Sequence, residues 1–163
     1  ASELYISCRD KDENLTVAPD ALKKNLRTYL NEFRLISDAF DVLDTRVVNY
    51  GVRFAVTTDP KANKSIVVQA VIQNISNLLD IKFFQIDQPI VLADIVNVII
   101  NTDSVISLLE FEIFNIRGIV EERMYNPQSF NVIANTRNGM LIGPPGSIFE
   151  LKHPEFDIIG TAL

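Results

Sequence analysis

The residues with the clearest chemical potential lie in the stretch NGMLIGPPGSIFELKHPEFD, residues 138–157. Its glycines and prolines invite comparison with a phosphate-binding loop, which needs glycines at fixed spacing, a Lys-Ser/Thr pair and a following helix. Here no lysine follows Gly146, and two adjacent prolines remove two of the backbone N–H donors that such a loop uses. The alternating sequence SIFELKHP predicts a strand after the loop. We therefore expect GPPG to form a tight turn between two extended segments.

The same stretch contains His153, the only histidine of the chain, with Glu150, Glu155 and Asp157 close to it in sequence. A catalytic base or a zinc ligand needs partner groups at defined spacing. Side chains that follow one another in an extended segment point to opposite faces, and there is neither a second histidine nor an HExxH motif. We expect a surface or interface histidine, no metal site and no cofactor. An enzyme that uses His153 with a carboxylate in a cleft is a rival interpretation.

Pairs of carboxylates could indicate a hydrolase. Glu110 and Glu112 would share one face of a strand, and Glu121 and Glu122 are adjacent. Nothing in the sequence indicates that they are buried, so we expect them to be solvated or paired with cations. Three serines that could be nucleophiles lack the sequence context of a nucleophile elbow: Ser65, Ser76 and Ser147. The residues themselves therefore show no constellation that points to catalysis.

Composition narrows the remaining classes. Of the 163 residues, 47% are hydrophobic, which is enough for a packed core. The net charge of −6 argues against general binding to nucleic acid or to an anionic membrane. The longest apolar stretch, residues 90–100, is too short to span a bilayer and contains Asp94 and Asn97. The single cysteine, Cys8, excludes an internal disulfide and is expected to be buried in a strand.

Hydrophobic periodicity predicts alternating strands and helices. The strand expected over residues 45–58 has a buried apolar face and a mostly solvated polar face, with Gly51 as a kink or bulge. The buried face carries Val48, Tyr50, Val52, Phe54 and Val56, and the solvated face carries Thr45, Asn49, Arg53 and Thr57. Asp59 and Pro60 are expected to start the second helix as its N-cap and first residue. The predicted elements are a strand over 4–9, a helix over 19–37, the strand over 45–58, a helix to about 79, an edge strand over 83–90, a short helix over 92–99 and a strand over 105–116. In the last strand, Leu109, Phe111 and Ile113 are expected to face inward.

This order, β-α-β-α-(β)-α-β, predicts an α+β fold. The expected arrangement is a split β-α-β, ferredoxin-like open sheet with helices on one face. After Gly118 the prolines become frequent and the helical period is lost. We therefore divide the chain into an α+β domain, residues 1–118, and a C-terminal extension of short strands and turns, residues 119–163. Such an extension buries little by itself, so it is expected to pack on the domain or on a partner.

Three runs, taken in order, carry a resemblance to a known family. They are NLTVAPDALKKNLRTYLNEFRLISDAFDVLDTRVVNYGVRFAV, FFQIDQPIVLADIVNVI and NTRNGMLIGPPGSIFELKHPEFDIIG. Together they resemble the C-terminal region of a baseplate wedge protein of T4-like contractile-tail phages, related to baseplate J-like proteins. The resemblance extends from about Leu4 to Gly160 and makes residues 1–118 a baseplate J-like domain.

The resemblance implies a structural role and a protein that is not an enzyme, with no catalytic residues. Wedge proteins of this kind form homodimers and join wedges into the ring around the tail hub, where other wedge proteins bind them. The chain would be made in the host cytoplasm, be located in the virion as part of the tail baseplate, and bind neither nucleic acid nor membrane. Since family members are much longer, and since the sequence begins in a strand-like segment, the chain is expected to be a C-terminal fragment.

Ring assembly requires self-complementary surfaces. We expect an apolar contact surface that draws on Ile142, Ile148, Phe149, Leu151, Phe156 and Ile158. Polar substitutions of Phe149 and Phe156 are predicted to weaken self-association. A ferredoxin-like module that binds a small molecule remains the alternative, and it would need a concave pocket with converging polar groups.

Overall fold

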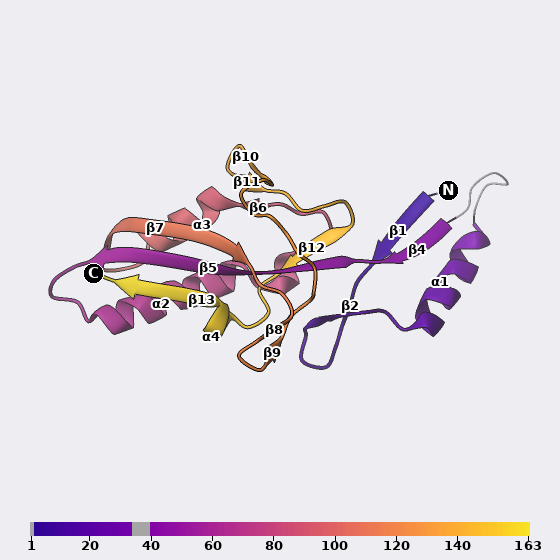
Figure 1. The fold of residues 1–163 in the computed structure, drawn as a ribbon, viewed down its shortest axis with the longest axis horizontal. Helices are drawn as coiled ribbons and strands as arrows, with labels where there is room; N and C mark the ends of the chain where they lie inside the picture. The colour runs from indigo at the N-terminus through magenta and orange to yellow at the C-terminus, as the bar shows by residue number, and fades with distance from the viewer. Residues whose placement is uncertain (1, 34–39) are drawn as a thin grey trace. The chain divides into compact units, whose positions relative to one another are not determined.

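A computed structural model describes residues 2–33 and 40–163. The chain forms two compact units, Ala1–Arg46 and Val47–Leu163 (Figure 1). This boundary differs from the one expected after residue 118, because the C-terminal segment shares a sheet with the strand that begins at Arg46. No described helix is long and apolar enough to cross a membrane.

The first unit is small. Its elements are β1 (Ser2–Ile6), β2 (Cys8–Arg9), β3 (Leu15–Thr16), α1 (Asp20–Asn31) and β4 (Phe40–Asp44). β1 pairs in parallel with β4, and β2 pairs with β3 in a short hairpin. The predicted single strand over 4–9 is therefore two strands, and Cys8 is partly exposed rather than buried.

Helix α1 confirms the first predicted helix in part. Pro19 precedes it as the N-cap residue instead of opening it, and the helix ends at Asn31. The rest of the prediction, residues 34–37, lies outside the described residues. None of the twelve residues of α1 is buried.

The second unit contains the larger core. Its elements are β5 (Arg46–Thr58), α2 (Lys64–Leu78), the 3-10 helix η1 (Ile81–Phe83), β6 (Ile90–Val91), α3 (Leu92–Ile100), β7 (Val105–Asn115), β8 (Ile119–Val120), β9 (Arg123–Met124), β10 (Thr136–Arg137), β11 (Met140–Leu141), β12 (Ser147–Glu150), α4 (Pro154–Asp157) and β13 (Ile158–Ala162). Strand β5 organises the main sheet: β7 pairs with it antiparallel, β13 pairs with it in parallel, and β12 pairs with it as well. The α+β class is confirmed, whereas these strand orders do not confirm a ferredoxin-like split β-α-β arrangement.

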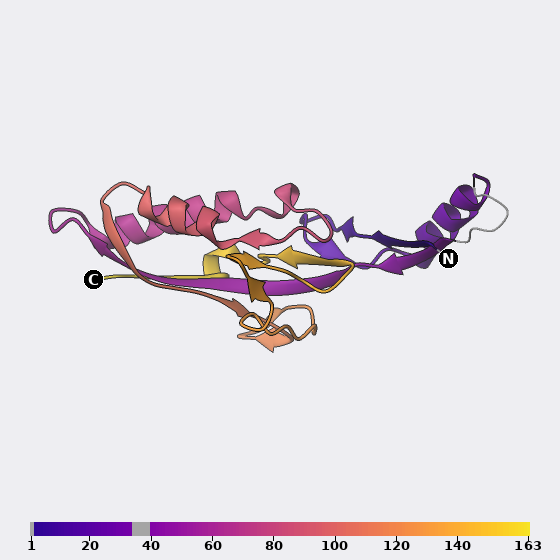
Figure 2. The same cartoon turned by 90° about the horizontal axis from the view of Figure 1, so that it is seen from above.

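One face of the sheet is closed by helices. α2 packs on β13 and α3 packs on β7, and Figure 2 shows both helices on the same side of β5. The five alternating residues predicted to face inward are all buried: Val48, Tyr50, Val52, Phe54 and Val56. They form one cluster with the buried helix residues Val71, Ile75, Ile95 and Ile99. Burial of these apolar side chains explains why the sequence period in each element matches its face.

The other face of β5 differs from the expectation at Asn49. This residue was assigned to the polar, solvated face, but only 1% of it is exposed. The C-terminal segment covers this end of the face and supplies hydrogen-bond partners from Asn126 and Glu150. Arg53, further along, lies on the exposed part and forms a salt bridge with Glu112 at 2.8 Å.

Strand β7 contains a bulge that the alternation did not predict. Glu110 pairs with Ala55, but the next residue of β5, Val56, pairs with Leu108. The skipped residue, Leu109, is 49% exposed although it was expected to face inward with Phe111 and Ile113. Leu108 instead packs against the core, because a one-residue bulge exchanges the two faces of the strand beyond it.

The predicted start of the second helix and the predicted strand over 83–90 are both wrong. Asp59 caps a turn, accepting from the Lys61 backbone N–H at 2.8 Å, and the helix begins only after Asn63, whose side chain accepts from Ser65 and Ile66 N–H groups. Residues 83–90 were expected to be an edge strand. Instead, Phe83 ends η1, residues 86–87 form a turn, and Ile90 is the first residue of the two-residue strand β6.

Candidate functional site

The candidate site is a groove of about 370 Å³ in the second unit. Its walls come from the end of β7, the β8–β9 hairpin and the junction between α4 and β13. The lining residues are Phe114, Asn115, Ile116, Arg117, Val120, Glu121, Arg123, Tyr125, Phe156, Asp157 and Ile159. Figure 2 shows β8 and β9 on the side of β5 opposite to α2 and α3, so the groove lies on the face that the helices leave uncovered.

A buried carboxylate anchors the groove. Asp157 closes the single-turn helix α4 and is only 3% exposed. One carboxylate oxygen accepts from the Tyr125 hydroxyl at 2.5 Å, and the other accepts from the His153 backbone N–H at 2.9 Å. Burial raises the pKa of Asp157 above its ordinary value, because the low-dielectric surroundings disfavour the charged form more than these hydrogen bonds favour it. Burial and the bond to Asp157 also raise the pKa of Tyr125 to about 12.

Arg123 connects this pair to the rim. Its guanidinium donates to the Tyr125 hydroxyl at 3.3 Å and to Glu121 at 2.7 Å. The same guanidinium lies over the ring of Phe156, 4.0 Å from the centroid. These three contacts fix a planar cation against an aromatic ring, which is an arrangement enriched at protein interfaces.

Gly51 makes the close packing of the floor possible. A Cβ placed on Gly51 would lie 2.5 Å from the Phe114 ring and 2.6 Å from the Asp157 carbonyl oxygen. The glycine was predicted to mark a kink or bulge, but β5 keeps its register with β7 there, since Gly51 pairs with Phe114 and Val52 with Ile113. It serves instead for close approach of two elements to the strand.

Two asparagines hold the segment that covers the sheet. The Asn49 side chain donates to Glu150 Oε1 at 2.9 Å and accepts from the Asn126 backbone N–H at 2.7 Å. Asn115 donates to the Asn49 carbonyl at 2.9 Å and accepts from the Phe130 N–H at 3.0 Å. Because these bonds satisfy backbone groups of residues 126–130, an irregular segment can lie on the sheet without a strand ladder.

The six residues predicted to form a contact surface divide into two groups. Four of them are buried inside the second unit: Ile148, Phe149, Leu151 and Ile158, each at most 6% exposed. They pack in the chain's own core, since β12 and β13 pair with β5, and therefore they are not available as a surface. Ile142 and Phe156 are exposed, at 44% and 51%, and only Phe156 lines the groove.

The structure also places the residues considered for catalysis. His153 packs its ring edge-on against Tyr125, with the ring centroids 5.5 Å apart, and its backbone N–H donates to the Asp157 carboxylate. Glu112 and Glu121 are paired with arginines, as expected for solvated carboxylates. In the part of the chain that the structure describes, no three His, Cys, Asp or Glu residues come together in a way that could hold a metal ion.

The GPPG stretch is the predicted turn between two extended segments, β11 and β12. The backbone N–H of Gly146 donates to Asp87 Oδ1 at 2.7 Å, and the Asp87 N–H donates to the Ser147 carbonyl at 2.8 Å. A carboxylate of the same chain thus occupies the donor that an anion would have used.

Sequence reasoning did not single out Arg123 and Tyr125. The signal was present, because Glu121, Arg123 and Tyr125 alternate at the spacing that places side chains on one side of an extended segment. The sequence does not reveal the partner of Tyr125, which is Asp157, 32 residues further on. Neither a known protein family nor a curated protein sequence matches this chain.

Proposed function

We propose that this chain is a structural component of a contractile phage-tail baseplate, a wedge protein that self-associates and joins wedges into the ring around the hub. The resemblance of the three sequence runs supplies the family. The observation that supports an assembly role is the exposed groove around Phe156, where apolar side chains and a fixed arginine face outward. Aromatic residues and arginine are enriched in contacts between proteins.

Two further features suit an assembly protein. Among the described strands, β7 and β13 each pair with β5 alone, so each leaves one edge open for strand addition. Part of the apolar stripe of α1 is also exposed, with Leu22 at 47% and Tyr29 at 59%, and Phe33, just beyond the helix, is 70% exposed. Helical stripes of this kind are usually covered, since apolar surface is stabilised by removal from water.

The mass of the protein in solution tests this proposal, alone and mixed with neighbouring wedge proteins. We expect a mass of at least a dimer that rises when those proteins are added. Phe156→Asp should lower the association constant at least tenfold, because it places a charge in an apolar contact. Ile133→Asp is the matched control: Ile133 is 90% exposed and lies outside the groove. A wild-type chain that stays monomeric in every mixture would contradict the proposal.

A small-molecule-binding module is the second candidate, and the size of the same groove favours it. Its volume falls within the range of about 300–1,000 Å³ that is typical of ligand pockets, and polar groups converge beside apolar ones. A thermal-shift screen of metabolites would support this candidate if a compound raised the unfolding temperature of the wild type but not of Phe156→Asp.

We also propose a detailed fold for this chain, the ferredoxin-like split β-α-β arrangement. Helices on one face of an open sheet are the feature that supports it. An experimental structure in which a further strand separates two parallel strands would establish it.

A further inference from the structure

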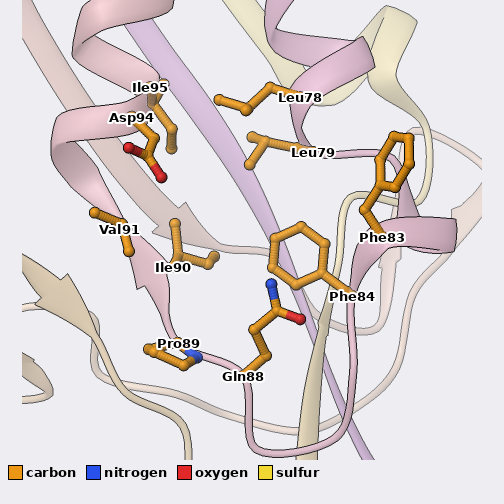
Figure 3. A pocket seen from close by; sticks show the side chains of 10 residues that line it. All are labelled: Leu78, Leu79, Phe83, Phe84, Gln88, Pro89, Ile90, Val91, Asp94 and Ile95. Atoms are coloured by element: carbon orange, nitrogen blue, oxygen red, sulfur yellow. The ribbon is translucent and has the colours of Figure 1, made fainter.

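A second, smaller groove lies where α2 ends and α3 begins. Its volume is about 120 Å³, which is room for one amino-acid side chain rather than for a metabolite. The lining residues are Leu78, Leu79, Phe83, Phe84, Gln88, Pro89, Ile90, Val91, Asp94 and Ile95. Figure 3 shows these side chains around a common centre, with the Phe84 ring at its edge.

Eight of the ten lining residues are apolar, and two polar side chains point into the groove. Gln88 Oε1 accepts from the Gln85 backbone N–H at 2.9 Å, so the Gln88 amide nitrogen is the end that faces the groove in Figure 3. The Asp94 carboxylate points inward from the first turn of α3. No ion pair links Asp94 to another residue of the described ranges 2–33 and 40–163.

The nearest lysine in the sequence is already engaged. Lys82 Nζ lies 3.4 Å from the Asp80 carboxylate and 5.1 Å from the centroid of the Phe83 ring. Lys82 does not line the groove, and Asp94 is the one charged residue among those that do. The net charge of the chain is −6. A carboxylate beside apolar walls is complementary to a cation carried on an alkyl stem.

We propose that this groove binds a basic side chain, lysine or arginine, of a partner protein. The alkyl stem lies along the lining side chains that remain accessible, Leu78, Phe84 and Val91, and the cation meets the Asp94 carboxylate. The positive end of α3 opposes a cation, but its effective half charge is smaller than the full charge of Asp94. A wholly apolar occupant would strip water from Asp94 without replacing it, and an acidic occupant would be repelled.

This inference does not depend on the baseplate assignment, because the groove shares no residue with the groove around Phe156. It identifies a recognition site by its chemistry, whichever partner presents the side chain.

The test uses four small probes of similar length: n-butylammonium, n-butylguanidinium, 1-butanol and butyrate. Each is titrated into the isotope-labelled full chain while amide NMR signals are followed. We expect both cations to shift the Gln88 side-chain amide and the backbone signals of residues 91–95, with dissociation constants in the millimolar range that one salt bridge and a short alkyl chain support. Butanol should bind several-fold more weakly, and butyrate should leave these signals unchanged.

Two variants remove the same charge at different places. Asp94→Asn should weaken binding of both cations about fivefold, the factor that corresponds to roughly 1 kcal/mol for a partly exposed ion pair. Asp103→Asn should leave it unchanged, because Asp103 is exposed and does not line the groove. Equal binding of cations and butanol, equal effects of the two substitutions, or no shifts at these signals would each overturn the proposal.

Discussion

The two faces of β5 are closed by different means. The helix side is closed by apolar packing: Val48, Val52 and Val56 are fully buried in one cluster with residues of α2 and α3. The opposite side carries Asn49, which is buried through hydrogen bonds, and Arg53, which is exposed in a salt bridge. The first face is closed along its length, whereas the second is closed at one end and open at the groove.

This difference between the two faces of β5 indicates where interaction surfaces are available in this chain. Apolar packing needs only the right period, so the helix face forms from residues that the sequence makes obvious. The opposite face depends on particular donors and acceptors in residues 115–157, and those bonds leave the remaining sheet surface for the groove. Substitutions on the two faces should therefore have unequal effects.

The largest contrast is expected between two phenylalanines. Phe149→Ala should lower the free energy of unfolding by about 3–5 kcal/mol, because Phe149 is 2% exposed in the helix-side core and its loss leaves a cavity. Phe156→Ala, in the groove, should lower it by less than about 1 kcal/mol, since the side chain is half exposed. Urea unfolding of both variants measures the difference. Similar losses would remove the distinction between a closed face and an open one.

A smaller contrast lies within the polar face. Asn49→Ala should lower the free energy of unfolding by about 2–3 kcal/mol, because buried groups of Asn126 and Glu150 lose their partners. Arg53→Ala should lower it by less than about 1 kcal/mol, since both members of the Arg53–Glu112 pair are about half exposed. The same unfolding experiment compares the two variants. A larger loss of unfolding free energy for Arg53→Ala than for Asn49→Ala would be evidence that the Asn49 hydrogen bonds do not hold the covering segment.

The pH dependence of stability sharpens the description of the groove. Burial raises the pKa of Asp157 in the folded state above 3.8, so protonation stabilises the fold. This contribution is fully present below the unfolded pKa and is lost as the pH rises through the folded-state pKa. The wild type should accordingly lose stability relative to Asp157→Asn as the pH is raised from acid towards neutrality. Unfolding measured across that range checks the sign, with Asp103→Asn as the exposed control; a difference that does not vary with pH would contradict it.

The smallest predicted effect separates two tyrosines. The Tyr50 hydroxyl is buried on the helix side with no hydrogen-bond partner in the described structure, so Tyr50→Phe should be neutral or stabilising by up to about 1 kcal/mol. Tyr125→Phe should instead destabilise by about 1–2 kcal/mol, because its hydroxyl bridges Arg123 and Asp157. Thermal unfolding compares the two, and destabilisation by Tyr50→Phe would indicate that its hydroxyl has a partner.

Local pattern was enough to predict β5, the ends of α3 to within a residue, most of β7 and the GPPG turn. Periodicity reports which residues face the same way, and for β5 the helix-side residues were correct at every position. Periodicity does not report a bulge, and therefore Leu109 was assigned to the wrong face. Local pattern also did not identify the N-cap residue of α2, which is Asn63 rather than the predicted Asp59.

The candidate site was predicted poorly for a different reason. Whether Phe149 or Phe156 is exposed depends on β12 and β13 pairing with β5, and nothing in residues 147–162 specifies that partner. The Tyr125–Asp157 bond joins residues whose separation in sequence hides their contact. The candidate site is therefore formed by pairing between segments that are distant in sequence, and local sequence patterns do not predict such pairing.

The parallel pairing of β13 with β5 can form only late in synthesis, because β13 is made long after β5. Ile158 pairs with Val52, a separation of 106 residues (158 − 52), so ribosomes that add about 5–20 residues per second deliver this partner roughly 5–20 s after β5 emerges. During that interval the β5 edge that β13 will occupy has no native partner, although α2, α3 and β7 are already made. A growing chain is thus most vulnerable to mispairing with its neighbours on a polysome at this edge, and chaperones that bind extended apolar segments would act on it before synthesis is finished.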